Sequence, residues 1–338
     1  EPDKLPGLSH FAAAVINESG LGRLDKDQLA MALAGKNTNI SFQIDQGKFY
    51  FAGTSVPGET ALMMQLLRTH LLDPGFRPNA LALVKERFRQ EYAAMSRSID
   101  DAYKLHTHPF LAGDDSRFSY PRPSILPDIT LEAIQDWVGL PLDVSDVEIA
   151  VVGDFDPDTV IEEASRYMGS IPSSLQKPAV VPIAAPQFPV AKHREKQVAT
   201  KIPKALVVVA FPTADIWDIS RARRLNLLAR IFSEKIRERI REKLGAAYSP
   251  YAYNRSSATY EGYGVLEAHV LVDPDRSKEV IDEVKAIAAG LAANGISSLE
   301  LRRAVEPTLT GLKEYTAQNG YWLHSVLGNC GRQPARLD

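Results

Sequence analysis

A repeated order of elements constrains the fold of this chain more than any single motif does. A strand that ends at Val56 is followed by a proline-containing turn, a helix, a short break and a second helix, and the same order follows Val272. Such self-similarity indicates two copies of one structural unit. Two complete copies at this spacing would need more than the 338 residues present. We therefore expect the first copy to lack a strand equivalent to 205–211, and the second to lack a tail equivalent to roughly 125–170.

The elements of the two copies predict an α+β fold. It has two related domains, each an antiparallel sheet covered by helices on one face. The first predicted domain spans 1–170 and the second spans 196–338. The segment 171–195 between them is rich in proline and is predicted to be an extended linker.

Local patterns predict individual elements within the two domains. In the first we expect a hairpin formed by 41–44 and 49–51, a helix over 79–95, a polar, proline-rich loop over 106–127 and a buried strand over 147–152. In the second we expect strands over 205–211, around Tyr251 and over 265–272, a long helix over 221–244, and a last helix that Ser298 caps.

Composition excludes several classes of protein. With 39 basic and 42 acidic residues the formal net charge is −3, which argues against an obligate nucleic-acid binder. The single cysteine, Cys330, excludes an intramolecular disulfide and a thiolate-rich zinc site. No apolar run approaches the ~20 residues of a membrane-spanning helix. A cysteine-poor chain of this kind fits the cytosol and the bacterial periplasm equally well.

The stretch from Gly7 to Ala14 resembles the start of the insulinase/pitrilysin family of zinc peptidases (peptidase M16). Active members carry an H-x-x-E-H helix there, whose two histidines bind zinc while the glutamate activates water. A distant glutamate completes their ligand set. The resemblance places the first histidine at His10, the general base at Ala13, the second histidine at Ala14 and the distant glutamate at Glu91.

Alanine can neither accept a proton nor bind zinc, and two remaining ligands are too few for a catalytic zinc site. The resemblance therefore implies that this chain is the half without the zinc site. The other interpretation of His10 is a capping or loop residue. For Glu91 it is a solvated or ion-paired helix residue.

Two longer segments are also similar to this family. Residues 113–121 with 147–156 (VEIAVVGDFD) resemble the non-catalytic third domain of large bacterial members, and 128–132 fit the same pattern. Residues 239–249 are similar to the R-x-x-E-x-L-G-x-A-Y-S segment of the last domain. The resemblance covers the chain from Gly7 to about Leu327.

In active members an arginine and a tyrosine of this last segment reach the zinc site, where such groups can bind the substrate carbonyl and stabilise its developing oxyanion. The resemblance assigns the arginine to Arg239, with Arg241 as its rival, and the tyrosine to Tyr248. Tyr248 lies two residues later than the tyrosine of insulin-degrading enzyme. The alternative places Arg239 on a solvated helix face and Tyr248 at the start of a strand.

Other candidate sites carry weaker patterns. His106 and His108 have the spacing of some metal ligands but favour a loop, and Asp114 with Asp115 favours a turn or helix cap over a cation site. The basic run 235–243 alternates with glutamates. That alternation is typical of a salt-bridged helix face and not of a nucleic-acid patch.

The resemblance implies the C-terminal, non-catalytic half of a zinc metalloendopeptidase that closes over unfolded peptides. An N-terminal catalytic half or subunit would hold the zinc, and this half would hold no cofactor. It would form a chamber wall and offer a strand edge to the peptide. A catalytically inactive structural or assembly subunit of the same fold is the alternative. The bacterial members imply a periplasmic location, with the cytoplasm left open.

Overall fold

The computed structural model describes residues 5–144, 147–171, 183–244, 248–328 and 333. Contacts divide the chain into two units: Glu1–Ala94 with Ser119–Val181 form unit 1, and Met95–Phe118 with Pro182–Asp338 form unit 2. Residues 95–118 were predicted to belong to the first domain, but their contacts place them in unit 2. Most of the predicted linker 171–195, namely 172–182, falls outside the described residues. The domain boundaries remain a prediction.

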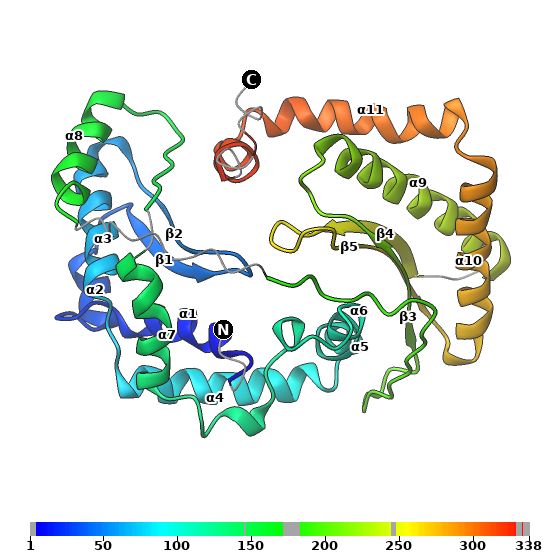
Figure 1. Ribbon diagram of the computed structural model, residues 1–338, viewed down its shortest axis with the longest axis horizontal. Helices are drawn as coiled ribbons and strands as arrows, with labels where there is room; N and C mark the ends of the chain where they lie inside the picture. The colour runs from blue at the N-terminus through cyan, green and yellow to red at the C-terminus, as the bar shows by residue number, and fades with distance from the viewer. Residues whose placement is uncertain (1–4, 145–146, 172–182, 245–247, 329–332, 334–338) are drawn as a thin grey trace. The chain divides into compact units, whose positions relative to one another are not determined.

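Unit 1 combines an antiparallel hairpin with helices. The predicted hairpin is present, and its strands pair Phe42 with Phe51. The two helices predicted after it are also present. The elements are α1 (Leu8–Ser19), α2 (Lys26–Ala32), β1 (Asn39–Ile44), β2 (Phe49–Thr54), α3 (Thr60–Leu72), α4 (Pro78–Met95), α7 (Leu131–Val144) and α8 (Pro157–Met168) (Figure 1).

The core of unit 1 lies between the hairpin and three helices. It is built from the apolar faces of α1, α4 and α7, which meet the side chain of Phe42 on β1. Phe11, Phe88 and Ile134 are among its fully buried members. Since α1 belongs to this core on one side, its position in unit 1 is fixed by packing.

The predicted buried strand over 147–152 is wrong. No strand is assigned there, and Val147, Ile149 and Val151 are 53%, 38% and 37% exposed. An apolar run becomes a buried strand only where a neighbouring strand can pair with it. Among the described residues, the sheet of unit 1 contains β1 and β2 alone.

The predicted loop over 106–127 is also wrong in part, because it contains several helical turns. A π-helical turn spans Tyr103–Thr107, α6 spans His108–Leu111, and 3-10 turns span Ser116–Phe118 and Pro123–Ile125. Pro109 and Pro123 stand in the first turn of their helices. Proline is favoured at that position because its missing N–H would have no intrahelical partner there.

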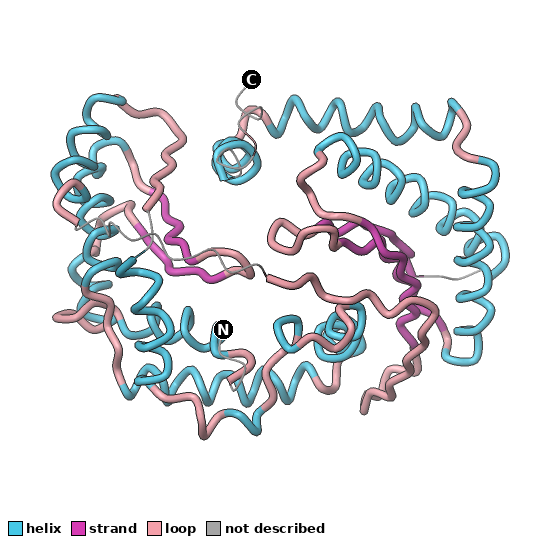
Figure 2. Tube along the Cα trace, viewed as in Figure 1, coloured by secondary structure: helices cyan, strands magenta, loops and turns pink. Residues whose placement is uncertain are grey.

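Unit 2 contains a three-stranded antiparallel sheet in the order β3-β5-β4. Two helices cover one face of it, and a short helix, α5, with α6 lies against the other (Figures 1 and 2). The elements are α5 (Ile99–Ala102), β3 (Ala205–Thr213), α9 (Ile219–Leu244), β4 (Tyr248–Ser256), β5 (Gly264–Val272), α10 (Ser277–Asn294) and α11 (Ser298–Tyr315). The α+β class with antiparallel sheets and covering helices is thereby confirmed. The cap of α11 is Ser297 and not Ser298, because Ser297 forms a reciprocal capping box with Glu300.

The central strand β5 determines what lies on each face of this sheet. Leu266, Ala268 and Val270 point into the apolar core with α9 and α10. Side chains alternate along a strand, so Glu267 and His269 point to the opposite face. Both are buried, since Tyr103 of segment 95–118 lies over this face.

Candidate functional site

Helix α1 carries His10, Ala13 and Ala14, three of the positions that the resemblance assigns to the zinc site. The ring of His10 packs edge-on against Phe11, Phe88 and Tyr120, at centroid distances of 5.5, 5.7 and 4.9 Å. Ala13 and Ala14 are partly buried and pack against the core of unit 1. Two of the four motif positions are therefore occupied by methyl groups that complete an apolar core.

The pKa of His10 depends on burial and on the charge of Glu91. Burial lowers the pKa of His10, and the charge of Glu91 on α4 opposes part of that shift. The hydroxyl of Tyr120 lies 3.4 Å from Nε2 of His10. The positions that the resemblance assigns to the first histidine and the distant glutamate are thus coupled through the charge of Glu91. A zinc ion does not fit, because the described residues contain no group of three or more His, Cys, Asp or Glu that could hold a metal.

Restoring the two missing groups should create a metal site. We expect the double variant Ala13→Glu, Ala14→His to bind one zinc ion per chain, because His10, the new histidine and Glu91 would supply three ligands. Isothermal titration with zinc and metal analysis after dialysis would measure it. The variant Ala13→Gln, Ala14→Gln adds similar bulk without an imidazole or carboxylate, so equal zinc uptake by both variants would contradict the assignment of these positions.

The predicted transition-state residues lie in unit 2. Nε of Arg239 donates to Oε1 of Glu283 on α10 at 2.6 Å, and the Arg239 side chain is 52% exposed. Arg241 lies in α9 and Tyr248 begins β4, but their side chains fall outside the part of the chain that the structure describes.

In the basic run 235–243, Lys235 pairs with Glu300 of α11. That pair and Arg239–Glu283 join α9 to neighbouring helices, whereas Arg237 pairs with Glu234 within α9.

The residues of the weaker candidate sites form contacts with other side chains of the same chain. Asp114 forms a two-pronged ion pair with Arg194 at 2.6 Å, and Asp115 forms one with Arg117. His108 stacks on Tyr103 and meets the edge of Phe118. Their observed contacts therefore hold parts of unit 2 together.

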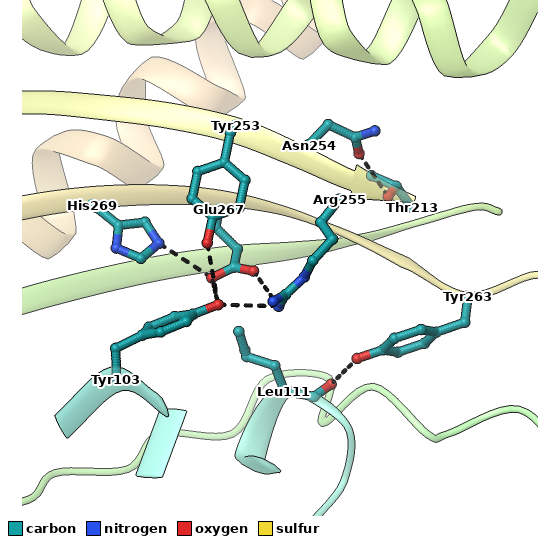
Figure 3. A network of polar contacts seen from close by, with 9 residues as sticks. All are labelled: Tyr103, Leu111, Thr213, Tyr253, Asn254, Arg255, Tyr263, Glu267 and His269. Atoms are coloured by element: carbon teal, nitrogen blue, oxygen red, sulfur yellow. Dashed lines mark hydrogen bonds and ion pairs between the residues drawn. The ribbon is translucent and has the colours of Figure 1, made fainter. Parts of the chain in front are cut away.

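A buried polar network on the sheet of unit 2 was missed by the sequence analysis (Figure 3). The carboxylate of Glu267 accepts hydrogen bonds from the Tyr103 hydroxyl at 2.6 Å and from Nη2 of Arg255 at 2.7 Å. Nε2 of His269 lies 3.2 Å from the same carboxylate. The Tyr103 oxygen in turn accepts from Arg255 at 3.0 Å and from the Tyr253 hydroxyl at 3.2 Å.

The charges of this network compensate one another. Burial raises the pKa of Glu267, but the hydrogen bond from His269, the charge of Arg255 and the hydrogen bond from Tyr103 outweigh it and hold that pKa below its usual value. Burial and the nearby carboxylate raise the pKa of Tyr103, so its phenol keeps its proton and remains a donor. The network therefore holds segment 95–118 to the polar face of β5.

One signal in the sequence could have revealed this network. Glu267 and His269 are polar residues in an otherwise apolar strand, 264–272. Because they are two residues apart, both side chains lie on the same face of the strand. A carboxylate is almost never fully buried unless it is paired. The pattern implies that a basic side chain pairs with Glu267 on that face. No feature close to Tyr103 in the sequence indicates that this residue joins the network.

His108 makes the stability of unit 2 dependent on pH. Burial and the charge of Arg255 lower its pKa to about 4, while Glu267 and a backbone hydrogen bond to Phe118 oppose the shift. The unfolded chain binds a proton near pH 6.5 and the folded chain does not, so stability should fall as the pH drops from 6.5 towards 4. Urea unfolding across this range should show a smaller decline for His108→Gln. Identical declines in both proteins would contradict the assignment.

Comparison with known proteins decides the family. The model of the peptidase M16 inactive domain matches residues 128–307, more than half of the chain. This chain belongs to the peptidase M16 inactive-domain family. The probable zinc protease PqqL of Haemophilus influenzae is 25% identical over 325 residues, which cover 92% of this chain and 33% of that protein. The M16 chain thus spans about a third of the length of this curated relative.

Solved structures agree on the fold of this M16 chain. The periplasmic protease PqqL from Escherichia coli matches 97% of it with a TM-score of 0.77 and 16% identity, over 36% of that protein's chain. A peptidase M16 inactive domain from Pseudomonas fluorescens matches 94% of it with a TM-score of 0.73 and 19% identity, over 76% of that chain. No helix among the described residues has the length and apolar character needed to cross a membrane.

Proposed function

We propose that this chain is the non-catalytic, C-terminal half of an M16 zinc metalloendopeptidase. It acts with a zinc-bearing N-terminal half or subunit and forms one wall of a chamber that closes over unfolded peptides. Arg239, with Arg241 as the alternative, and Tyr248 contact the substrate carbonyl. The periplasm is the proposed compartment, as for the Escherichia coli relative, and the cytoplasm is the alternative.

One observation carries this proposal. The methyl groups of Ala13 and Ala14 pack against the core of unit 1, at the positions that the resemblance assigns to the general base and the second histidine. Neither alanine has a group that could bind zinc or activate water. Peptide hydrolysis then requires a zinc site on another polypeptide segment.

Reconstitution tests the proposal. The purified chain alone should not cleave a fluorogenic unfolded peptide, with or without added zinc. Adding a zinc-bearing M16 half encoded with it should produce cleavage that a chelator abolishes. A matched mixture in which that half lacks its H-x-x-E-H glutamate controls for contaminating proteases. Metal-dependent cleavage by this chain alone would contradict the proposal.

The ion pair of Arg239 favours a second candidate function. Since Glu283 already binds the guanidinium, Arg239 has a structural partner within its own unit. A catalytically inactive structural or assembly subunit would need no more than this. In that case the chain would form a stable complex with its partner, and the complex would have no peptidase activity.

A further inference from the structure

The outer edge of β4, in the sheet of unit 2, forms backbone hydrogen bonds with the protein's own helix α9 at one residue. Among the described residues, β4 is an outer strand of this sheet and pairs with β5 on one side. An edge strand presents unpaired N–H and C=O groups to which another extended chain can pair. At Ala252, however, the N–H donates to Oγ of Ser233, and the Ser233 hydroxyl donates to the Ala252 carbonyl oxygen at 3.1 Å.

These two hydrogen bonds show which way Ala252 faces. In an antiparallel pair, opposite residues alternate between those that exchange hydrogen bonds and those whose N–H and C=O point away from the partner strand. Ala252 lies opposite Ala268 on β5 but bonds Ser233, so both its backbone groups point outward. A hydroxyl can donate and accept at once, and Ser233 therefore satisfies both groups.

Helix α9 makes a second contact with β4. Asn226, seven residues before Ser233 and hence two turns away on the same face, accepts from Nδ2 of Asn254 at 3.3 Å. Ser233 is buried and lies next to Phe232, which belongs to the core with Ala252 packed against it. The helix can therefore leave the edge only by disrupting that core.

The start of β4 carries two further features that oppose strand pairing. Its register with β5 is irregular between Tyr248 and Tyr251. Pro250, which has no N–H, lies within that irregularity. Proline and bulges are devices by which proteins block strand edges.

We propose that α9 seals the outer edge of β4, so that the sheet of unit 2 takes up no extended peptide as an added strand there. The importance of the seal rests on the proposed function, which brings unfolded peptides to this chain. Such peptides pair readily with open edges, and a bound strand would be retained. The strand edge that the resemblance leads us to expect for the peptide is therefore not the edge of β4.

Hydrogen exchange of the full chain tests the seal without any peptidase assay. The Ala252 amide should be protected in the wild type and should exchange about 5-fold faster in Ser233→Ala, which loses one hydrogen bond to that amide. Ser220→Ala, on the exposed first turn of the same helix, should leave the rate unchanged. An Ala252 amide that exchanges at the rate of an unprotected chain in the wild type would overturn the proposal.

A strand probe gives the second readout. A peptide with the sequence of residues 264–272, extended by two lysines for solubility, carries the β5 sequence that pairs with β4 in the fold. Added in about 50-fold excess, it should leave the Ala252 amide resonance and exchange rate of the wild type unchanged. Protection or a shift of Ala252 on titration would refute the seal. Because neither readout involves cleavage, failure of the proposed function leaves this result interpretable.

Discussion

Replacing Arg255 by methionine should lower the free energy of unfolding by about 3 kcal/mol at neutral pH, because removal of one partner of a buried ion pair leaves a charge without compensation. Glu267 is fully buried, whereas the Arg255 side chain is 37% exposed, so the low end of the usual range applies. Urea unfolding followed by circular dichroism would measure the loss. The exposed pair of Arg237 with Glu234 provides the control, and Arg237→Met should cost less than about 1 kcal/mol.

The effect of Arg255→Met should depend on pH in a defined direction. The pKa of Glu267 is held below its usual 4.5, so its stabilising contribution is complete above that pH and is lost as the pH falls through the lower folded-state value. In the variant the carboxyl group can take a proton. The difference between the two proteins should therefore shrink in acid.

A double variant separates the pair from its surroundings. Arg255→Met combined with Glu267→Leu replaces both charges by apolar groups and should recover at least half of the loss. If the double variant is less stable than Arg255→Met alone, the hydrogen bonds from Tyr103 and His269, and not the ion pair, stabilise this face.

Replacing Arg239 by alanine should lower kcat/KM of the reconstituted peptidase by roughly 100-fold, since loss of one donor to a developing oxyanion costs about that much. Tyr248→Phe should have an effect in the same direction. Cleavage rates measured at saturating and subsaturating concentrations of the fluorogenic peptide would show whether the decrease is in kcat or in KM. Arg237→Ala, two residues away on α9, is the matched control and should leave the rate unchanged.

Glu283→Gln distinguishes the two roles of Arg239. It removes the ion-pair partner but keeps the guanidinium, so a substrate contact predicts a rate within a few-fold of the wild type. If Arg239 serves only to join α9 to α10, both variants should lose about 0.5 kcal/mol of stability or less and retain full activity. That result would assign Arg239 a structural role and would contradict its proposed contact with the substrate carbonyl.

Local patterns predicted most elements of this fold but not the segments whose state depends on distant neighbours. The hairpin and the long helices follow from periodicity and caps that lie within a few residues. The run 147–152 has the composition of a buried strand, yet its fate depends on whether a partner strand lies beside it. The turns within 106–127 include two begun by proline, a residue whose position in the first turn makes it a helix starter rather than a breaker.

The sequence by itself determined that positions 13 and 14 can neither bind zinc nor move a proton, because alanine has no group that could do so wherever the chain places it. Only the tertiary structure decided that Tyr103 joins Arg255 at Glu267, and that Ser233 occupies the edge of β4. Those contacts link residues far apart in the chain. Their free energies arise from burial and from hydrogen-bond geometry, which exist only once the sheet and its helices have packed.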